Sequence, residues 1–282
     1  MGYAIALASA ALYGSADFIG GLTARRTNTM AAVLISQFAG LAMLILMLPF
    51  LEGAPTRGDF GWGAAAGMAG GTGVALLYRA LAVGTMAVVA PITAVCAVAI
   101  PVIVAMALGE RPATLALFGI VLALVAIALV GQQTSVDVTS AAPRPSSSGI
   151  SLALMSGVAI GLFFLFLART APAAGLWPLL SARTASVSVF AIGALVRQRT
   201  LRMPAPVLAL VVCGGVIDML ANLLYLIATR SGPLSIIVTL SSLYPASTVI
   251  LARMVLGEKL SVWQGAGIVC ALVAVVMIVG GA

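Results

Sequence analysis

Long apolar stretches, separated by short polar segments, run through the whole of this chain. A bilayer core about 30 Å thick requires about 20 apolar residues of helix. Ten stretches of this kind predict helices at residues 3–22, 29–51, 60–82, 85–108, 113–131, 149–170, 176–196, 204–228, 232–256 and 261–281. The stretches are apolar throughout and do not alternate with polar residues, which favours helices over the strands of a membrane barrel. The pattern therefore predicts an all-α integral membrane protein.

A short motif occurs twice in the chain, at a separation of 148 positions. Gly109-Glu110-Arg111 and Gly257-Glu258-Lys259 each stand between the last two apolar stretches of one half. At an offset of 147 further pairs coincide: Gly2 with Gly149, Ser9 with Ser156, Gly14 with Gly161, and Tyr78 with Tyr225. We therefore expect residues 1–131 and 149–282 to form two five-helix repeats, joined by a Pro- and Ser-rich linker at 132–148.

The number of crossings in each repeat determines how the halves are related. Because five is odd, the second unit enters the membrane from the face opposite to the first, so the repeats are inverted. Inverted repeats are typical of secondary transporters, in which exchanging the conformations of the halves moves a central site from one side to the other. A duplication without such alternating access is the alternative.

Two groups of residues resemble a known family. The segment Ser241-Ser242-Leu243-Tyr244-Pro245, with the stretch from Gly257 to Gly265 beginning twelve positions after Pro245, is similar to the ninth-to-tenth helix signature of EamA-type carriers in the drug/metabolite transporter superfamily. The stretch from Leu12 to Phe18 resembles the family's opening motif. The resemblance extends over all ten predicted spans.

This resemblance implies a ten-helix carrier like the bacterial exporters of amino acids and related metabolites. We therefore expect a multi-pass protein of the bacterial inner membrane that exports small metabolites, with neutral or aromatic amino acids as the best single choice. Efflux of lipophilic drugs or cations is a second interpretation.

The composition excludes several other classes. With 62% apolar and 7% charged residues, the chain does not resemble a soluble domain. Its net charge of +7 comes largely from Arg residues in short loops, where lipid headgroups and not nucleic acid are the expected partner. There is no His, and Cys96, Cys213 and Cys270 are isolated, so we expect no metal and no cofactor.

An ATP-driven or enzymatic function is also disfavoured. The chain contains no Gly-Lys dipeptide and hence no Walker A motif, so no ATPase subunit is implied. A membrane-embedded enzyme or an assembly factor is a distant alternative, but Asp17 and Asp218 are expected toward opposite faces. Because both inverted halves lie in one chain, a monomer is sufficient to bind and move a small-molecule substrate.

The orientation of the chain has two conflicting indicators. Nine Lys or Arg residues fall in or beside the segments after the odd-numbered helices: 25, 26, 79, 144, 197, 199, 202, 253 and 259. The positive-inside rule would place these segments in the cytoplasm and both termini outside. The family resemblance implies cytoplasmic termini.

Four charged residues lie inside the predicted spans: Asp17, Arg79, Arg183 and Asp218. A charge at the centre of an inserted helix costs about 2.5 to 3.5 kcal/mol on the insertion scale, so such residues indicate a function. Counting residues from the membrane faces suggests that Arg183 and Asp218 meet near mid-depth. We expect these groups to line a wet cavity that binds a zwitterion, or to carry a coupled proton; two structural ion pairs are the alternative.

Aromatic and neutral polar residues complete the predicted pocket: Tyr13, Tyr78, Phe163, Phe164, Asn222, Tyr225, Ser242 and Tyr244. Mostly uncharged walls suit neutral or amphiphilic solutes. Tyr78 and Tyr225 are equivalent under the repeat, so they either close opposite mouths of the pocket or anchor helix ends at the membrane interface.

Prolines distinguish the two halves. Pro245 corresponds to Ala97 in the first repeat, where the fourth helix carries Pro91 and Pro101 instead. Because proline removes a backbone hydrogen bond, helices four and nine are expected to bend during the cycle, or to hold a static kink.

The Gly-Glu turns are interpreted as structural. Glycine suits the left-handed position that ends a helix, and Ser261 with Gln264 has the spacing of a capping box at the start of the last helix. The residues assigned to this role are Gly109, Glu110, Gly257 and Glu258. The spacing of Gly63, Gly67 and Gly71 predicts a close approach of a neighbouring helix to helix three.

Overall fold

The computed structural model describes residues 1–24, 27, 29–47, 52–83, 86–130, 147–196, 203–256 and 261–281. Within these ranges the protein is all-helical and no strand is found. The first half contains α1 (Gly2–Ala24), α2 (Thr29–Met47), α3 (Arg57–Val83), α4 (Met86–Ala107) and α5 (Thr114–Val130). The second half contains α6 (Ser147–Ala168), the short 3-10 helix η2 (Pro172–Ala174), α7 (Trp177–Val196), α8 (Ala205–Thr229), α9 (Leu234–Ser241), α10 (Tyr244–Leu256) and α11 (Val262–Gly280).

These helices account for ten membrane crossings. Seven helical stretches in the described part are long and apolar enough to span a bilayer, and one of them combines α9 with α10 as Leu234–Val255. Two further apolar stretches are shorter, at Ile92–Ala107 and Thr114–Val130. The remaining crossing is α3, which has 27 residues and a more polar composition. The predicted ten-helix, all-α membrane fold is thus confirmed.

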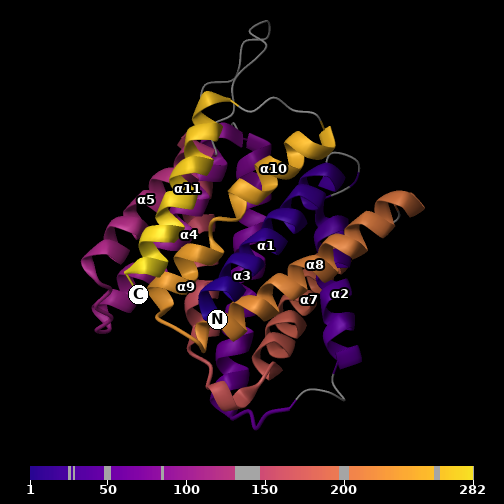
Figure 1. The fold of residues 1–282 in the computed structure, drawn as a ribbon. Coiled ribbons are helices and arrows are strands. Elements are labelled where there is room, and N and C mark those ends of the chain that lie inside the picture. The colour runs from indigo at the N-terminus through magenta and orange to yellow at the C-terminus, as the bar shows by residue number, and fades with distance from the viewer. Residues whose placement is uncertain are drawn as a thin grey trace, which may run out of the picture.

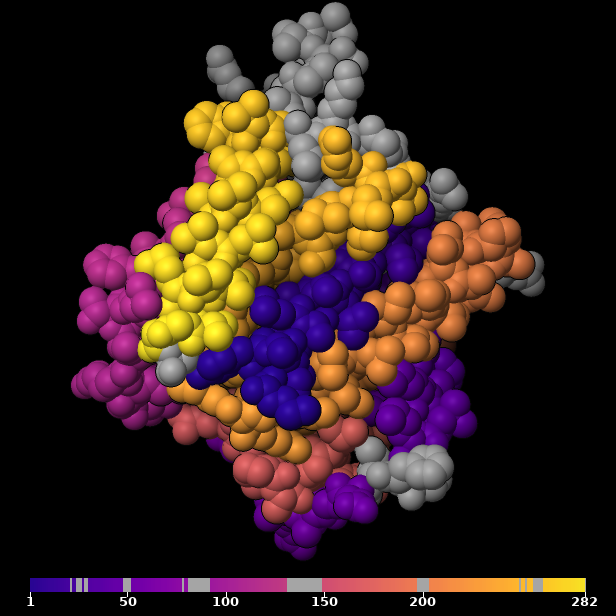
Figure 2. All heavy atoms as spheres, in the orientation of Figure 1, coloured from indigo at the N-terminus to yellow at the C-terminus, as the bar shows by residue number. Residues whose placement is uncertain are grey.

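The packing of the helices repeats under exchange of the two halves. Helix α1 packs against α8, α9 and α10, and its counterpart α6 packs against α3 and α4. Helix α2 packs on α8 as α7 packs on α3, and α5 lies beside its own counterpart α11 (Figure 1). Figure 2 shows α1 lying between α10 and α8 on one side of the molecule. This arrangement is that of two inverted repeats related by a two-fold axis.

Individual residues follow the same symmetry. A Cβ placed on Gly14 would lie 2.5 Å from the carbonyl oxygen of Tyr244 on α10. One placed on the equivalent Gly161 would lie 3.2 Å from that of Ala97 on α4. Both first helices therefore approach the fourth crossing of the other half through a glycine, as the sequence alignment of the halves implies.

The termini and the loops define two faces of the bundle. Both termini lie at the end of the bundle where α2, α4, α6 and α8 end, which we call the terminal face (Figure 1). Helices α1, α3, α5, α7 and α10 end at the other side, which we call the opposite face.

The ninth crossing is broken. The crossing expected at 232–256 is present as Leu234–Val255, but its helix is interrupted, because α9 ends at Ser241 and α10 begins at Tyr244. Pro245 stands in the first turn of α10, where a missing backbone N–H is tolerated, and it prevents a continuous hydrogen-bond ladder across the break. By contrast α4 is one helix through Pro91 and Pro101.

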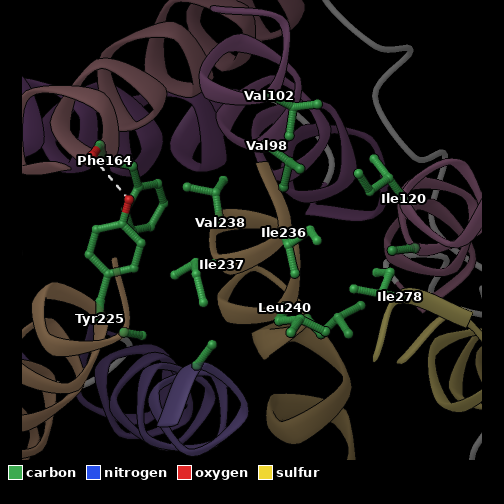
Figure 3. Close-up of a cluster of buried hydrophobic side chains, with 14 of the residues drawn as sticks. Val98, Val102, Ile120, Phe164, Tyr225, Ile236, Ile237, Val238, Leu240 and Ile278 are labelled. Carbon is green, nitrogen blue, oxygen red and sulfur yellow. Dashed lines mark hydrogen bonds between the residues drawn. The ribbon is translucent and has the colours of Figure 1, made fainter. Parts of the chain in front are cut away.

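Short helix α9 occupies the centre of the protein. Every residue from Ser235 to Ser241 is buried. Figure 3 shows Ile236 and Leu240 of α9 among side chains that include Val98 of α4 and Ile278 of α11. The broken crossing thus packs against helices of both repeats.

The outer surface carries the lipid contacts. Phe118 of α5 is 63% exposed, and Trp263 and Leu272 of α11 are also exposed. In a membrane-spanning protein such side chains face lipid, where apolar exposure carries no penalty.

Several predicted turns and contacts are also present. Gly109 has a φ of 107°, a conformation that suits glycine at a helix end. Ser261 and Gln264 form the predicted capping box at the start of α11, with hydrogen bonds of 3.1 and 3.0 Å. Gly257 and Glu258 lie outside the described residues.

The predicted close approach to α3 is confirmed. A Cβ on Gly67 would lie 2.0 Å from the carbonyl oxygen of Ala182 on α7, and one on Gly63 would lie 2.4 Å from that of Pro178. Near Gly71 the ring of Phe190 would lie 3.0 Å from an added Cβ.

Candidate functional site

A cavity of about 100 Å³ lies between the two repeats, among α1, α2 and α8. The residues around it belong to the second half of α1 and the first halves of α2 and α8, which places it toward the opposite face. Its polar lining consists of Asp17, Thr23, Ser36, Gln37 and Asp218. The remaining lining residues are small or aliphatic.

Asp17 and Asp218 meet at this cavity. The expectation that they lie toward opposite faces is wrong, because each sits several turns inside its helix and α1 packs along α8. Among the described residues, no hydrogen bond or ion pair is found for the Asp17 carboxylate. The cavity therefore presents one unpaired and one paired carboxylate.

Arg183 is the partner of Asp218. Its guanidinium donates to Asp218 Oδ2 and to Gln37 Oε1, and its Nε lies 3.2 Å from the sulfur of Met219. The Arg183 side chain is 9% exposed, whereas that of Asp218 is 32% exposed. A buried guanidinium requires such partners because desolvation of an unpaired charge is costly. The structure thus brings the two charges together, with the carboxylate on the wetter side.

Gln37 is a functional candidate that the sequence analysis did not identify. Its side-chain oxygen accepts from Arg183 and lies 3.4 Å from the hydroxyl of Ser186, so it links α2 to α7. The available indication was a lone amide next to Ser36 inside an apolar stretch.

Tyr13 and Asn222 lie next to the two cavity carboxylates along their helices. Tyr13 lies one turn from Asp17 on α1, and Asn222 lies one turn from Asp218 on α8, in both cases toward the terminal face. The Tyr13 hydroxyl donates to Asn222 Oδ1 at 3.0 Å, and Asn222 Nδ2 donates to the Asp218 carbonyl at 2.6 Å. The first bond joins α1 to α8, and the second lies within α8.

An aromatic cluster adjoins Tyr13. The Tyr13 ring contacts Phe164 and Tyr244 edge-on, with centroids 6.1 and 6.3 Å apart. Phe164 in turn lies 5.4 Å from Phe163 and 4.7 Å from Tyr225. Five predicted pocket residues are therefore contiguous, as a packed barrier next to the cavity.

Tyr225 is not an interfacial anchor. It is fully buried, and its hydroxyl donates to the carbonyl oxygen of Phe164 at 3.0 Å (Figure 3). The expectation of an anchor fails for this residue because its side chain points into the bundle toward Phe164 of α6, although α8 ends one turn later at Thr229. The side chain of its repeat partner Tyr78 lies outside the described residues.

The remaining candidates with described side chains do not line the cavity. Arg79 is exposed, and Pro101 is buried where α4 meets Gly161. Ser242 lies at the break between α9 and α10, with a buried hydroxyl that has no hydrogen-bond partner among the described residues. The Pro91 side chain lies outside the described residues, and Pro245 lies in the first turn of α10.

Metal ligands are not gathered at this site. Within the described ranges, no group of three or more His, Cys, Asp or Glu residues comes together. The polar lining is better suited to hydrogen bonds and to pairing with a cationic group.

Comparisons with known proteins identify the fold and the family. No curated protein matches the sequence. A solved structure, described only as the crystal structure of a protein, superposes with a TM-score of 0.77 at 14% identity, over 98% of this chain and 95% of that one. This likeness shows a shared fold. The model of the EamA-like transporter family matches residues 1–132 and 147–280. The chain therefore belongs to the EamA-like transporter family, within the drug/metabolite transporter superfamily.

Proposed function

We propose that this transporter exports small metabolites, foremost neutral or aromatic amino acids, across the bacterial inner membrane by alternating access. Family membership makes it a membrane transporter of small molecules. The observation that carries the finer proposal is the cavity between the repeats, with Asp17 and Asp218 on its wall.

The chemistry of the cavity suits a zwitterion. Asp17 is free to accept the ammonium group of a substrate, since Asp218 is already held by Arg183. Thr23, Ser36 and the Gln37 amide provide neutral groups for the remaining polar atoms. A purely lipophilic solute would leave the Asp17 carboxylate without a counter-charge, which disfavours such a cargo.

The size of the cavity also discriminates between substrates. At about 100 Å³ it is smaller than the roughly 300 to 1,000 Å³ of sites for drug-sized ligands, which disfavours bulky drugs as cargo. A small amino acid fits more readily than a large one. An aromatic side chain requires Tyr13 to move away from Asn222, which makes Tyr13 the expected determinant of size selectivity.

The direct test is counterflow uptake into proteoliposomes, which needs no assumption about a driving ion. Proteoliposomes that contain the purified protein are loaded with unlabelled amino acid. The entry of labelled neutral and aromatic amino acids into them is compared with entry into protein-free vesicles. Selective uptake that unlabelled substrate competes supports the proposal. Absence of uptake from folded protein, with uptake of a lipophilic cation instead, contradicts it in favour of drug efflux.

Variants of the cavity connect the activity to the site. Asp17→Asn and Asp218→Asn should each reduce counterflow, because both remove a carboxylate from the wall. Arg253→Gln is the matched control, since Arg253 is an exposed charge in the last turn of α10. If both Asn variants transport and express as the unaltered protein does, the two ionised groups are structural and the binding role assigned to them is wrong.

A further inference from the structure

The wall of the cavity carries charge of one sign. Among its described lining residues, the charged ones are Asp17 and Asp218, and both are carboxylates. The carboxylate of an amino acid therefore meets no positive group on the wall itself. The cation that the structure places at the site is Arg183, which does not line the cavity but contacts two residues that do.

Gln37 and Asp218 separate this cation from the cavity. The Arg183 guanidinium donates through one terminal nitrogen to Gln37 Oε1 and through the other to Asp218 Oδ2. A guanidinium has about five N–H donors. In the part of the chain that the structure describes, its third partner is the sulfur of Met219, 3.2 Å from Nε. Donors thus remain for a further acceptor, directly behind the wall.

The guanidinium itself is held in place by its surroundings. Arg183 is 7% exposed and lies against α2 and α8. A Cβ on Gly40, three residues after Gln37 on α2, would lie 3.5 Å from the Arg183 Nε and 3.2 Å from the Cβ of Met219. Packing this close leaves the guanidinium little room to move. A group that reaches it from the cavity must therefore displace one of the two side chains that cover it.

Gln37 is the cover that can be displaced. Asp218 provides the counter-charge, and without it Arg183 would be a buried, unpaired cation. Gln37 is neutral and half-buried, and the Ser186 hydroxyl, 3.4 Å from its Oε1, offers it another partner. A carboxylate binds a guanidinium through two parallel bonds and with opposite charge, which an amide oxygen cannot do. Exchange of the Gln37 oxygen for a carboxylate is therefore favourable, whereas loss of Asp218 is not.

We infer that Gln37 Oε1 occupies, in the empty cavity, the position on Arg183 that the carboxylate of the cargo takes when it binds. This inference rests on the proposed function and names the group that recognises the second charge of the amino acid. The ammonium group pairs with Asp17, and the carboxylate pairs with Arg183 while the Gln37 side chain moves aside. The transporter thereby distinguishes an amino acid from a related amine that lacks the carboxylate.

Two substitutions of Gln37 separate this role from a structural one. Gln37→Glu places a permanent carboxylate on Arg183, so the guanidinium is no longer available to the cargo. Gln37→Met has a similar size but only a weak acceptor, so it vacates the position without blocking it. A purely structural Gln37 predicts the reverse order, because Glu preserves the contact between α2 and α7 and Met breaks it.

Binding to purified protein in lipid nanodiscs measures the difference, because both faces meet the solution there. Isothermal titration calorimetry gives the Kd of alanine, of phenylalanine and of their amides, which keep the ammonium group but lack the charge of the carboxylate. In the unaltered protein, the amino acid that binds better should bind at least about tenfold more tightly than its amide. Gln37→Glu should weaken this amino acid at least about tenfold and leave its amide unchanged or tighter, whereas Gln37→Met should leave the amino acid unchanged or tighter.

Gln264→Glu is the matched control. Gln264 stands at the start of α11 and does not line the cavity, and its Oε1 accepts from the Ser261 N–H, a bond that Glu keeps. This variant introduces the same change of charge and should leave every Kd unchanged. Binding of the amides reports that each Gln37 variant is folded.

The order of the two Gln37 variants decides the outcome. Loss of amino-acid binding in Gln37→Glu, with retention in Gln37→Met, supports the carboxylate position. The reverse order, or an equal effect on each amino acid and its amide, overturns it, and amino-acid counterflow by the unaltered protein would then leave the proposed function intact. If the unaltered protein shows neither binding nor counterflow of amino acids, the proposed function fails and the carboxylate position fails with it.

Discussion

The carboxylate of Glu110, in the turn after α4, accepts a hydrogen bond of 2.7 Å from the backbone N–H of Leu234, the first residue of α9. Its second oxygen accepts from the N–H of Ser235 at 3.0 Å. Pro233 provides no side-chain cap of its own. The first repeat thus caps the short helix of the second, and it places a negative charge at the positive end of that helix dipole. This contact supports a structural role for the Gly-Glu turn.

Removing this cap should destabilise the protein. Glu110→Ala leaves two backbone donors of a central, buried helix unsatisfied, and we expect a loss of about 1 to 2 kcal/mol. Glu110→Gln, which keeps one acceptor, should lose less. Thermal unfolding in detergent measures both. Arg111→Ala is the neighbouring control, because within the described residues its exposed side chain makes a single long hydrogen bond, of 3.4 Å, to the carbonyl oxygen of Met106. An equal loss of stability in this variant would contradict the capping role of Glu110.

The ion pair between Arg183 and Asp218 should respond asymmetrically to mutation. Asp218→Asn leaves the less exposed guanidinium without its counter-charge, whereas Arg183→Gln leaves a carboxylate that the cavity can hydrate. We therefore expect Asp218→Asn to destabilise more than Arg183→Gln. A double-mutant cycle should give a coupling of about 1 to 3 kcal/mol between the sites.

The combined variant provides the check on this pair. Arg183→Gln with Asp218→Asn removes both charges, so it should be more stable than the sum of the single losses implies. Thermal unfolding of the four proteins gives the coupling. Additive losses would show that the two side chains act independently despite their contact.

The glycines at the crossings of the first helices differ in tightness. An added Cβ on Gly14 would lie 2.5 Å from the Tyr244 oxygen, but on Gly161 the corresponding distance to Ala97 is 3.2 Å. Gly14→Ala should therefore cost about 2 to 3 kcal/mol and Gly161→Ala about 1, within the range for overpacked sites. The midpoints of thermal unfolding measure this order, and the reverse order would contradict the packing.

The hydropathy pattern was sufficient to predict the spans, because the bilayer requires each of them to be apolar and of helical length. The recurring Gly-Glu motif indicated the two repeats, and the odd number of helices in each repeat indicated their inversion. The contact of Arg183 with Asp218 was also within reach, since depth follows from counting residues along a helix. Depth does not give the direction of a side chain around its helix. The meeting of Asp17 with Asp218 was missed for a different reason: each was assigned to the face nearer to it, although both lie several turns inside helices that pack together.

Other features depend on packing between distant segments. The break at Ser242 and Leu243 is indicated only loosely by Pro245, because proline is equally compatible with a kinked continuous helix, as α4 shows. Tyr225 is of a residue type common at membrane interfaces and lies near a helix end, yet it is buried because it packs against Phe164 of a distant segment. Gln37 is a site candidate because its side-chain oxygen accepts a hydrogen bond from Arg183, a residue 146 positions later in the chain.

The last prediction concerns Asp59, which lies in the first turn of α3 before its apolar stretch. The backbone N–H of Ala171 and the hydroxyl and N–H of Thr56 donate to its carboxylate and hold the pKa of Asp59 below its usual value. The folded state thus favours the ionised form, so the contribution to stability is fully present above the unfolded pKa of about 4. It is lost as the pH falls through the lower pKa of the folded state.

Comparison of the unaltered protein with Asp59→Asn isolates this contribution from other carboxylates. The unfolding midpoints of the two proteins are measured in detergent at pH 6, 5, 4 and 3, a range of about three units around the usual Asp pKa. The midpoints should differ most at pH 6 and converge toward pH 3. Thr56→Ala should reproduce part of the loss at pH 6, because it removes the hydroxyl that donates to Asp59. A difference that stays constant over this range would mean that Asp59 acts through its shape and neutral hydrogen bonds, and that its charge does not hold the segment after α6 against the start of α3.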